Sequence, residues 1–167
     1  MFNRKTKKYV LVVLVMSSFG LLTTPAAAKN RKLPGVHYCT SNTYWTTNYS
    51  SESTMYGLRS VNTGGNWRHT ACAIPSDSYF EHKDITQVNV HIGVVSNYVD
   101  ARLCVHNPTN NDVDCGAYKV TSGTGEQTIS FTGSDLDILI DYPYRNPFVE
   151  VTTYSDGNYI RGVYVSN

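Results

Sequence analysis

The sequence lacks the short motifs by which many enzymes can be identified. It contains no G-x-S-x-G, no H-E-x-x-H and no glycine-rich loop of the kind that holds phosphate groups. Serine, histidine and aspartate are present, but no spacing among them suggests a catalytic triad, and no two carboxylates stand out as a hydrolytic pair. These absences weigh against catalysis, and they leave a small secreted hydrolase as an alternative to a binding function.

Charge is also scarce, because Asp, Glu, Lys and Arg together make up 16% of the chain. Four of the 14 Lys and Arg residues lie within the first 28 positions. The rest of the chain therefore has 10 basic residues against 13 acidic ones, a net charge of −3 with histidine neutral. No basic run follows the Lys29 to Lys32 segment, so we expect no nucleic-acid partner.

Long hydrophobic runs are missing, and the one apolar stretch, Tyr9 to Leu22, has 14 residues. A bilayer-spanning helix needs roughly 20. Basic residues precede this stretch and Ala26-Ala27-Ala28 follows it, which is the pattern of a cleaved secretory signal peptide. We therefore expect a protein that is extracellular or periplasmic and has no membrane span after signal removal. The predicted organisation is a signal peptide over 1–28, a flexible leader over 29–36 and a single domain over 37–167.

Cysteines are few but even in number, and an oxidising compartment would allow them to pair. Cys39, Cys72, Cys104 and Cys115 allow three connectivities, which sequence alone does not separate. We favour Cys39–Cys72 and Cys104–Cys115, because Cys104 ends one strand-like run and Cys115 begins the next after a turn-rich loop, and a hairpin of these two strands would bring Cys104 and Cys115 opposite each other. Neither pair has the close spacing of a zinc site.

The part of the chain after the signal shows no convincing helical period, and short runs of alternating apolar residues predict strands instead. Turn-forming clusters separate these runs. We therefore predict an all-β antiparallel sandwich, jelly-roll-like and with two disulfides, and a closed barrel is the second choice. The expected strands are 55–61, 67–74, 85–95, 99–106, 115–120, 126–132, 138–140, 148–154 and 159–165.

Two further pairs of these strands are predicted to form hairpins. Ser155-Asp156-Gly157-Asn158 is a strong turn signal between the last two strands. A hairpin of 85–95 with 99–107 would match the two apolar faces if Val90 lies opposite Leu103. The same register gathers polar side chains on one outer face, where His91, Arg102 and His106 become candidate ligand-binding residues.

A second candidate surface is rich in aromatic residues and lies in an expected loop. Trp45 is flanked by Tyr44, Tyr49 and several Asn and Thr residues. An aromatic ring can stack on the apolar face of a sugar while nearby polar groups bind its hydroxyls. Trp45 could equally fold back over the core as a lid.

A cluster of oxygen donors makes structural calcium the one cofactor worth considering. Asp112 and Asp114 lie in a loop that also contains Asn110 and Asn111. Calcium needs six to eight oxygen ligands, and this run does not match an EF-hand loop. Asx residues in loops also serve simply to form turns.

Several short segments resemble a loose group of secreted bacterial β-sandwich proteins. They are Cys72-Ala73-Ile74-Pro75, the strand from Val88 to Val94, Ala101-Arg102-Leu103-Cys104-Val105, and Thr121-Ser122-Gly123-Thr124-Gly125 leading into Gln127-Thr128-Ile129-Ser130-Phe131. The resemblance implies a secreted sandwich and carries no activity. Our leading prediction is a secreted non-catalytic domain that binds polysaccharide or another cell-surface glycan. Besides the hydrolase, the alternative is a matrix protein that self-associates through strand edges.

Overall fold

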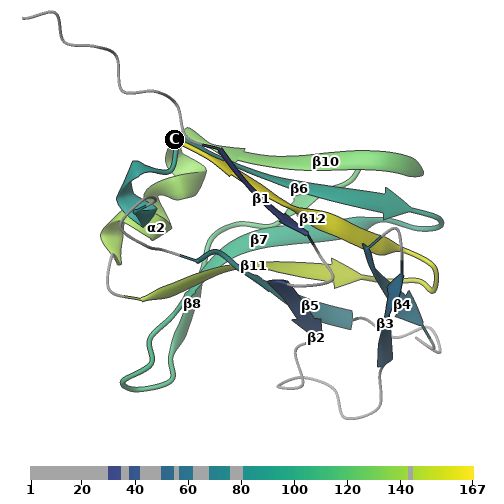
Figure 1. Ribbon diagram of the computed structural model, residues 1–167, viewed down its shortest axis with the longest axis horizontal. Coiled ribbons are helices and arrows are strands. Elements are labelled where there is room, and N and C mark those ends of the chain that lie inside the picture. The colour runs from purple at the N-terminus through teal and green to yellow at the C-terminus, as the bar shows by residue number, and fades with distance from the viewer. Residues whose placement is uncertain are drawn as a thin grey trace, which may run out of the picture.

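A computed structural model describes residues 30–34, 38–41, 50–54, 57–61, 68–75, 81–142 and 145–167. Within them the chain forms two antiparallel sheets stacked as a sandwich (Figure 1). This confirms the predicted fold class. Tyr44, Trp45 and Tyr49 lie outside the described residues.

We call the first layer sheet A. Its strands run in the order β10-β6-β12-β4-β3, and β1 also pairs with β12. Their bounds are β10 Gly125–Thr132, β6 Gln87–Val94, β12 Tyr159–Ser166, β4 Gly57–Val61, β3 Ser50–Thr54 and β1 Asn30–Pro34.

We call the second layer sheet B. Its strands run in the order β2-β5-β11-β7-β8, and β9 also pairs with β7. Their bounds are β2 Cys39–Ser41, β5 Arg68–Ala73, β11 Asn146–Thr153, β7 Val99–His106, β8 Val113–Cys115 and β9 Lys119–Val120.

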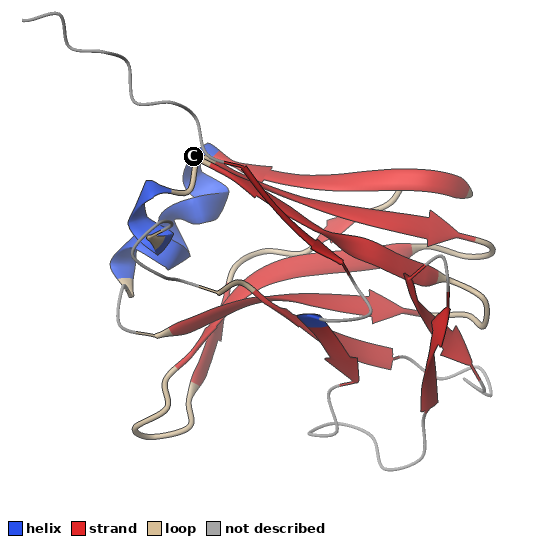
Figure 2. Ribbon diagram, in the orientation of Figure 1, coloured by secondary structure: helices blue, strands red, loops and turns tan. Residues whose placement is uncertain are grey.

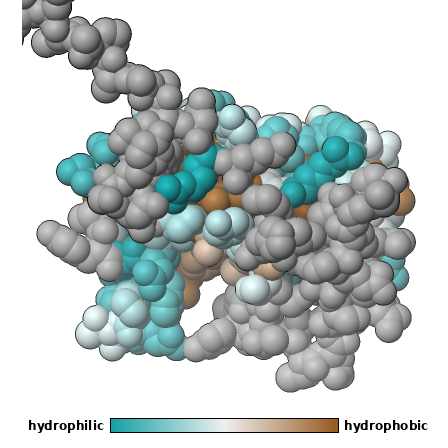
Figure 3. All heavy atoms as spheres, viewed as in Figure 1, coloured by the Kyte–Doolittle hydropathy of each residue, from teal (hydrophilic) through white to brown (hydrophobic). Residues whose placement is uncertain are grey.

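Alternation along the strands builds the core between the two sheets. On β6, Val88, Val90 and Ile92 are fully buried, and on β7, Val99 and Leu103 face them from the other layer. Polar and apolar residues alternate because successive side chains of a strand point to opposite faces. In the coloured part of Figure 3, apolar residues show in the middle, where the core reaches the surface between the layers.

Short helices close one end of the sandwich (Figure 2). They are η1 His82–Asp84, η2 Gly133–Leu136 and α2 Asp137–Asp141. The prediction of a strand over 138–140 was wrong, because these residues lie in α2. Their apolar character is explained by the buried side of these helical turns, where Leu136 and Leu139 reach the core. Among the described residues, no helix has the length and apolar character that crossing a bilayer requires.

Both disulfides have the pairing that we favoured. Cys39 lies directly opposite Cys72 on β2 and β5, and Cys104 lies opposite Cys115 on β7 and β8. The hairpin of β7 with β8 that prompted the second pair is therefore confirmed. The chain-entropy estimate for the two bridges is about 4 and about 3 kcal/mol of stability, respectively.

The two other predicted hairpins were wrong. β6 belongs to sheet A and β7 to sheet B, and likewise β12 and β11 belong to different sheets. Each connection is an arch that carries the chain from one layer to the other. An arch buries both alternating apolar faces as well as a hairpin does, so the pattern did not distinguish them.

The two arches lie against each other and share hydrogen bonds. Asn158 is fully buried, and its Oδ1 accepts from the backbone N–H groups of Val95, at 2.8 Å, and Ser96, at 3.3 Å. Its Nδ2 donates to the Ser96 carbonyl at 3.2 Å. Gly157 has a φ of +89° beside it, a backbone conformation that suits glycine.

The predicted flexible leader was wrong over residues 30–34. These residues form β1, which pairs with β12 along its whole length, from Asn30 opposite Ser166 to Pro34 opposite Gly162. Leu33 is 1% exposed. The segment is mostly polar, and its sequence therefore did not indicate that sheet A buries Leu33.

Candidate functional site

The structure separates the polar residues that the hairpin register had brought together. His91 lies on the outer face of sheet A, whereas Arg102 and His106 lie on the outer face of sheet B. Each of these residues alternates with core residues of its own strand and so points away from the core. His91 therefore points to the opposite side of the sandwich from Arg102 and His106. The predicted single face with all three residues was wrong.

The outer face of sheet B carries a buried charge network centred on Glu150 of β11. Glu150 Oε1 lies 2.8 Å from His69 Nδ1 on β5, and its Oε2 lies 2.5 Å from Arg102 Nε on β7. The strand register places Arg102 directly opposite Glu150. The Glu150 side chain is 4% exposed, so both of its oxygens are used within the protein.

This network fixes the charge of Glu150. Burial alone would raise the pKa of its carboxyl, but the hydrogen bonds from His69 and Arg102 and their charges outweigh it. The pKa therefore lies below its usual value, and Glu150 remains a carboxylate. A group of this kind suits an ion pair and is poorly suited to donate a proton in catalysis.

Two pairs of aromatic contacts flank the network on the same face. The Arg102 guanidinium lies over the Tyr118 ring, 4.4 Å from its centroid. The rings of Tyr98 and Tyr154 lie 4.4 Å apart with planes tilted by 39°. Tyr118 is 44% exposed and Tyr98 is 45% exposed, so each offers ring surface to solvent.

Asp100 holds the second aromatic pair in place. Its Oδ2 accepts a hydrogen bond from the Tyr154 hydroxyl at 2.8 Å. Asp100 is 7% exposed, and this burial raises the pKa of its carboxyl despite the hydrogen bonds from neighbouring hydroxyl groups. Desolvation and the adjacent Asp100 also raise the pKa of Tyr154, so its hydroxyl stays protonated as a donor.

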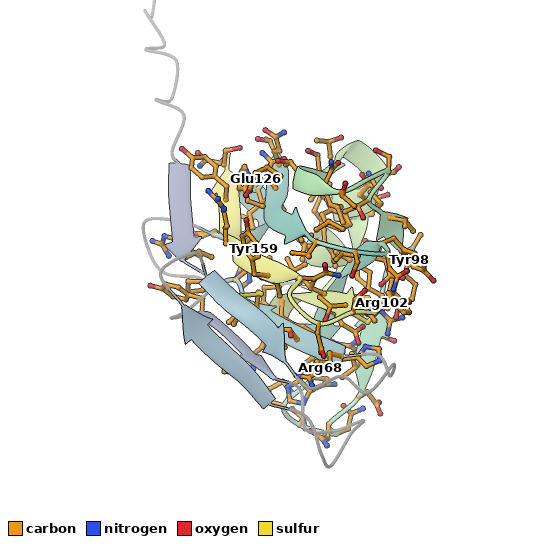
Figure 4. All side chains as sticks on the ribbon, turned by 90° about the vertical axis from the view of Figure 1, so that its right-hand side faces the viewer. Arg68, Tyr98, Arg102, Glu126 and Tyr159 are labelled. Atoms are coloured by element: carbon orange, nitrogen blue, oxygen red, sulfur yellow. A yellow bond between two sulfur atoms is a disulfide. The ribbon has the colours of Figure 1, made fainter. Side chains whose placement is uncertain are left out.

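The outer face of sheet A has a different construction. His91 Nδ1 lies 3.2 Å from the Thr128 hydroxyl. Tyr159 covers Gly93, where a Cβ would lie 2.0 Å from the ring, and its hydroxyl donates to Glu126 at 2.5 Å. Figure 4 shows Tyr98 and Arg102 on one side of the sandwich and Glu126 and Tyr159 on the other.

The remaining predicted residues lie at the β7–β8 end of sheet B. His106 Nε2 lies 2.7 Å from Asn111 Oδ1. Asp112 accepts from Asn110 and Asp114 is paired with Arg145, so both carboxylates take part in local contacts. Calcium at Asp112 and Asp114 stays a prediction.

Within the described ranges, the one cluster with metal-ligand geometry joins Glu150 to Cys104 and Cys115. Both sulfurs are in a disulfide and both carboxylate oxygens already have partners. These donors therefore do not fit a metal ion, which needs thiolate sulfurs and uncommitted oxygens.

Sequence reasoning missed most of the sheet-B cluster. Arg102 was predicted, but His69, Glu150 and Tyr118 were not, because they come from three other segments that only the sheet brings side by side. One signal was available: Glu150 interrupts the apolar residues of its strand. A charged residue inside such a run indicates a paired buried charge.

No family model and no curated protein matches this chain. Several solved structures are similar in fold, and two of them have a TM-score above 0.5. A xylan-binding module CBM15 is 11% identical with a TM-score of 0.54, covering 83% of this chain and 95% of the module. Xylanase 10C from Cellvibrio japonicus in complex with xylopentaose is 9% identical with a TM-score of 0.53, and the match covers 81% of this chain. This chain spans 28% of that xylanase, and at these identities the likeness shows the sandwich fold alone.

Proposed function

We propose that this chain is a secreted, non-catalytic module that binds polysaccharide through the outer face of sheet B. The observation that carries the proposal is the pair of half-exposed rings, Tyr98 and Tyr118, beside the fixed Arg102–Glu150 pair. Exposed aromatic rings next to placed polar groups are the mixture that sugar binding requires. The likeness to a xylan-binding module supports it at the level of fold.

The rigidity of this face also supports binding. Arg102 lies against Tyr118, and Asp100 holds Tyr154, on which Tyr98 stacks. Groups whose rotamers are already fixed lose less conformational entropy when a ligand binds. Secretion through residues 1–28, and a contribution from Tyr44, Trp45 and Tyr49, remain part of the proposal. The two disulfides are consistent with an oxidising compartment.

The test is binding of the purified, disulfide-bonded protein to a panel of soluble and insoluble polysaccharides, with calcium and with chelator. Tyr118→Ala and Tyr98→Ala should each raise Kd about tenfold, which corresponds to about 1.4 kcal/mol. The melting temperature should change little, because these rings are half exposed. Trp45→Ala, measured in the same assay, tests the predicted loop platform.

Tyr142 offers a matched control. It is 38% exposed and lies under the Arg145 guanidinium at 4.0 Å, but it follows α2 at the helical end of the sandwich. Tyr142→Ala should leave binding unchanged. The proposal fails if all three tyrosine variants lose affinity equally, or if the wild-type protein binds no polysaccharide. Release of reducing sugar ends from a polysaccharide would favour the hydrolase instead.

A further inference from the structure

Arg102 is held in one orientation by contacts on two sides. Its Nε donates to Glu150 Oε2 at 2.5 Å, and one face of its guanidinium lies on the Tyr118 ring. Glu150 is itself fixed from the other side by His69, at 2.8 Å. The Arg102 side chain is 26% exposed, so the group is anchored and still reaches solvent.

The anchoring leaves the far end of Arg102 unused. Within the described part of the chain its hydrogen bonds are limited to Nε, so Nη1 and Nη2 keep four N–H groups for another acceptor. A guanidinium presents these donors in a fixed planar fork. Such a fork fits two acceptor oxygens held side by side, as in a carboxylate or in neighbouring sugar hydroxyls.

Charge on the same face distinguishes these two ligands. Glu150 cancels the charge of Arg102, and Asp100 lies two residues before Arg102 on the same face of β7. The Arg102–Glu150 pair therefore has no net charge, and Asp100 adds no positive charge beside it. A carboxylate ligand would therefore find no uncompensated positive charge on this pair, whereas a pair of hydroxyls needs none.

The geometry points to Arg102 as the group that recognises two neighbouring hydroxyls of a neutral sugar unit, with Glu150 as the residue that positions it. This inference rests on the proposed function. A neighbouring sugar ring of the same polymer packs on the part of the Tyr118 ring that the guanidinium leaves exposed. The substrate class is a neutral polysaccharide, as opposed to a uronate or sulfated polymer.

The test measures Kd for neutral polymers (xylan, β-glucan and mannan) and for polygalacturonate. The wild-type protein should bind at least one neutral polymer and bind polygalacturonate at least tenfold more weakly. Arg102→Lys keeps the charge but loses the fork, so it should raise Kd for the neutral polymer at least tenfold. Arg161→Lys is the matched control, because Arg161 pairs with Glu126 at 2.7 Å on the opposite face and should have no effect.

Glu150→Gln tests the positioning role at a temperature where the variant is folded. It should weaken neutral binding about fivefold and strengthen polygalacturonate binding at low salt, because the Arg102 charge is then uncancelled. A merely structural role would not reverse the preference. If Tyr118→Ala abolishes neutral binding but Arg102→Lys does not, this inference fails and the proposed function stands. If the wild-type protein binds polygalacturonate more tightly than the neutral polymers, the inference is also overturned. If the wild-type protein binds none of these polymers, both the inference and the proposed function fail.

Discussion

Replacing Glu150 by glutamine should destabilise the protein far more than the loss of an ordinary surface ion pair. The carboxylate is 4% exposed and bonds to both Arg102 and His69. Glutamine has nearly the same shape, but its single carbonyl oxygen can accept from only one of these two groups. The other is left facing an amide N–H₂ group, which donates.

The magnitude follows from the burial of the pair. Breaking a buried ion pair by removing one partner costs about 3–5 kcal/mol. Arg102 is 26% exposed and keeps part of its hydration, and glutamine can retain one hydrogen bond, so the cost should lie just below this range. We expect a loss of about 2.5 kcal/mol. At about 4 °C per kcal/mol for a domain of this size, the melting temperature should fall by roughly 10 °C.

The difference between wild type and variant should depend on pH. The pKa of Glu150 in the folded protein lies below its ordinary value of 4.5, so its stabilising effect is complete above pH 4.5. That effect is lost as the pH falls through the lower folded pKa. The gap in melting temperature should therefore shrink on acidification. The Asp135 carboxyl, whose pKa Lys119 lowers, acts equally in both proteins and cancels.

Thermal unfolding followed by circular dichroism between pH 7 and pH 3 measures both effects. Glu126→Gln is the matched control, because Glu126 also pairs with an arginine and a hydroxyl but its side chain is 53% exposed. The control should cost at most about 0.5 kcal/mol. If the two variants melt within 2 °C of each other, or if the gap for Glu150→Gln is constant with pH, the account of the network is wrong.

Two further variants test the arch contact and the aromatic support. Asn158→Ala removes the acceptor shared by the Val95 and Ser96 amides, so the free energy of unfolding should fall by about 2 kcal/mol and the urea midpoint should fall with it. An unchanged midpoint would mean that the arches do not need this contact. Asp100→Asn should make the protein at least as stable as wild type at pH 7, because the raised pKa of Asp100 makes the wild type lose stability as the pH rises from 3.8 through the folded pKa. Asn keeps an acceptor for the Tyr154 hydroxyl. If the difference in melting temperature between the two proteins is the same at pH 3 as at pH 7, this prediction is contradicted.

The sandwich and its Cys104–Cys115 disulfide could be predicted because they depend on local patterns. Alternation along Val88, Val90 and Ile92 states which side of the strand is buried, whatever its partner. The Cys104–Cys115 bridge closes a short loop between neighbouring strands. Arg102 was identified as a candidate for a similar reason, since a charge on the polar side of an apolar strand points outward.

The partners of these strands were not predictable from the same pattern. A turn between two alternating strands satisfies the core equally well as a hairpin within a layer or as an arch between layers. Asn158 is part of what stabilises the arch, through contacts to residues more than 60 positions away. For this reason His91 and Arg102 came to lie on opposite faces.

By itself the sequence determined the β-class and the buried side of each long strand, and it favoured the pairing of Cys104 with Cys115, since these depend on residues close together in the chain. Only the tertiary structure decided that Glu150 lies between His69 and Arg102 and that the Arg102 guanidinium lies over the Tyr118 ring. These residues come from four separate segments, and hydrogen bonding between β5, β11 and β7 is what places them on one face. Only in that placement do these charges and rings interact with one another, because electrostatic and stacking contacts act over a few ångströms in space, whatever the separation along the chain.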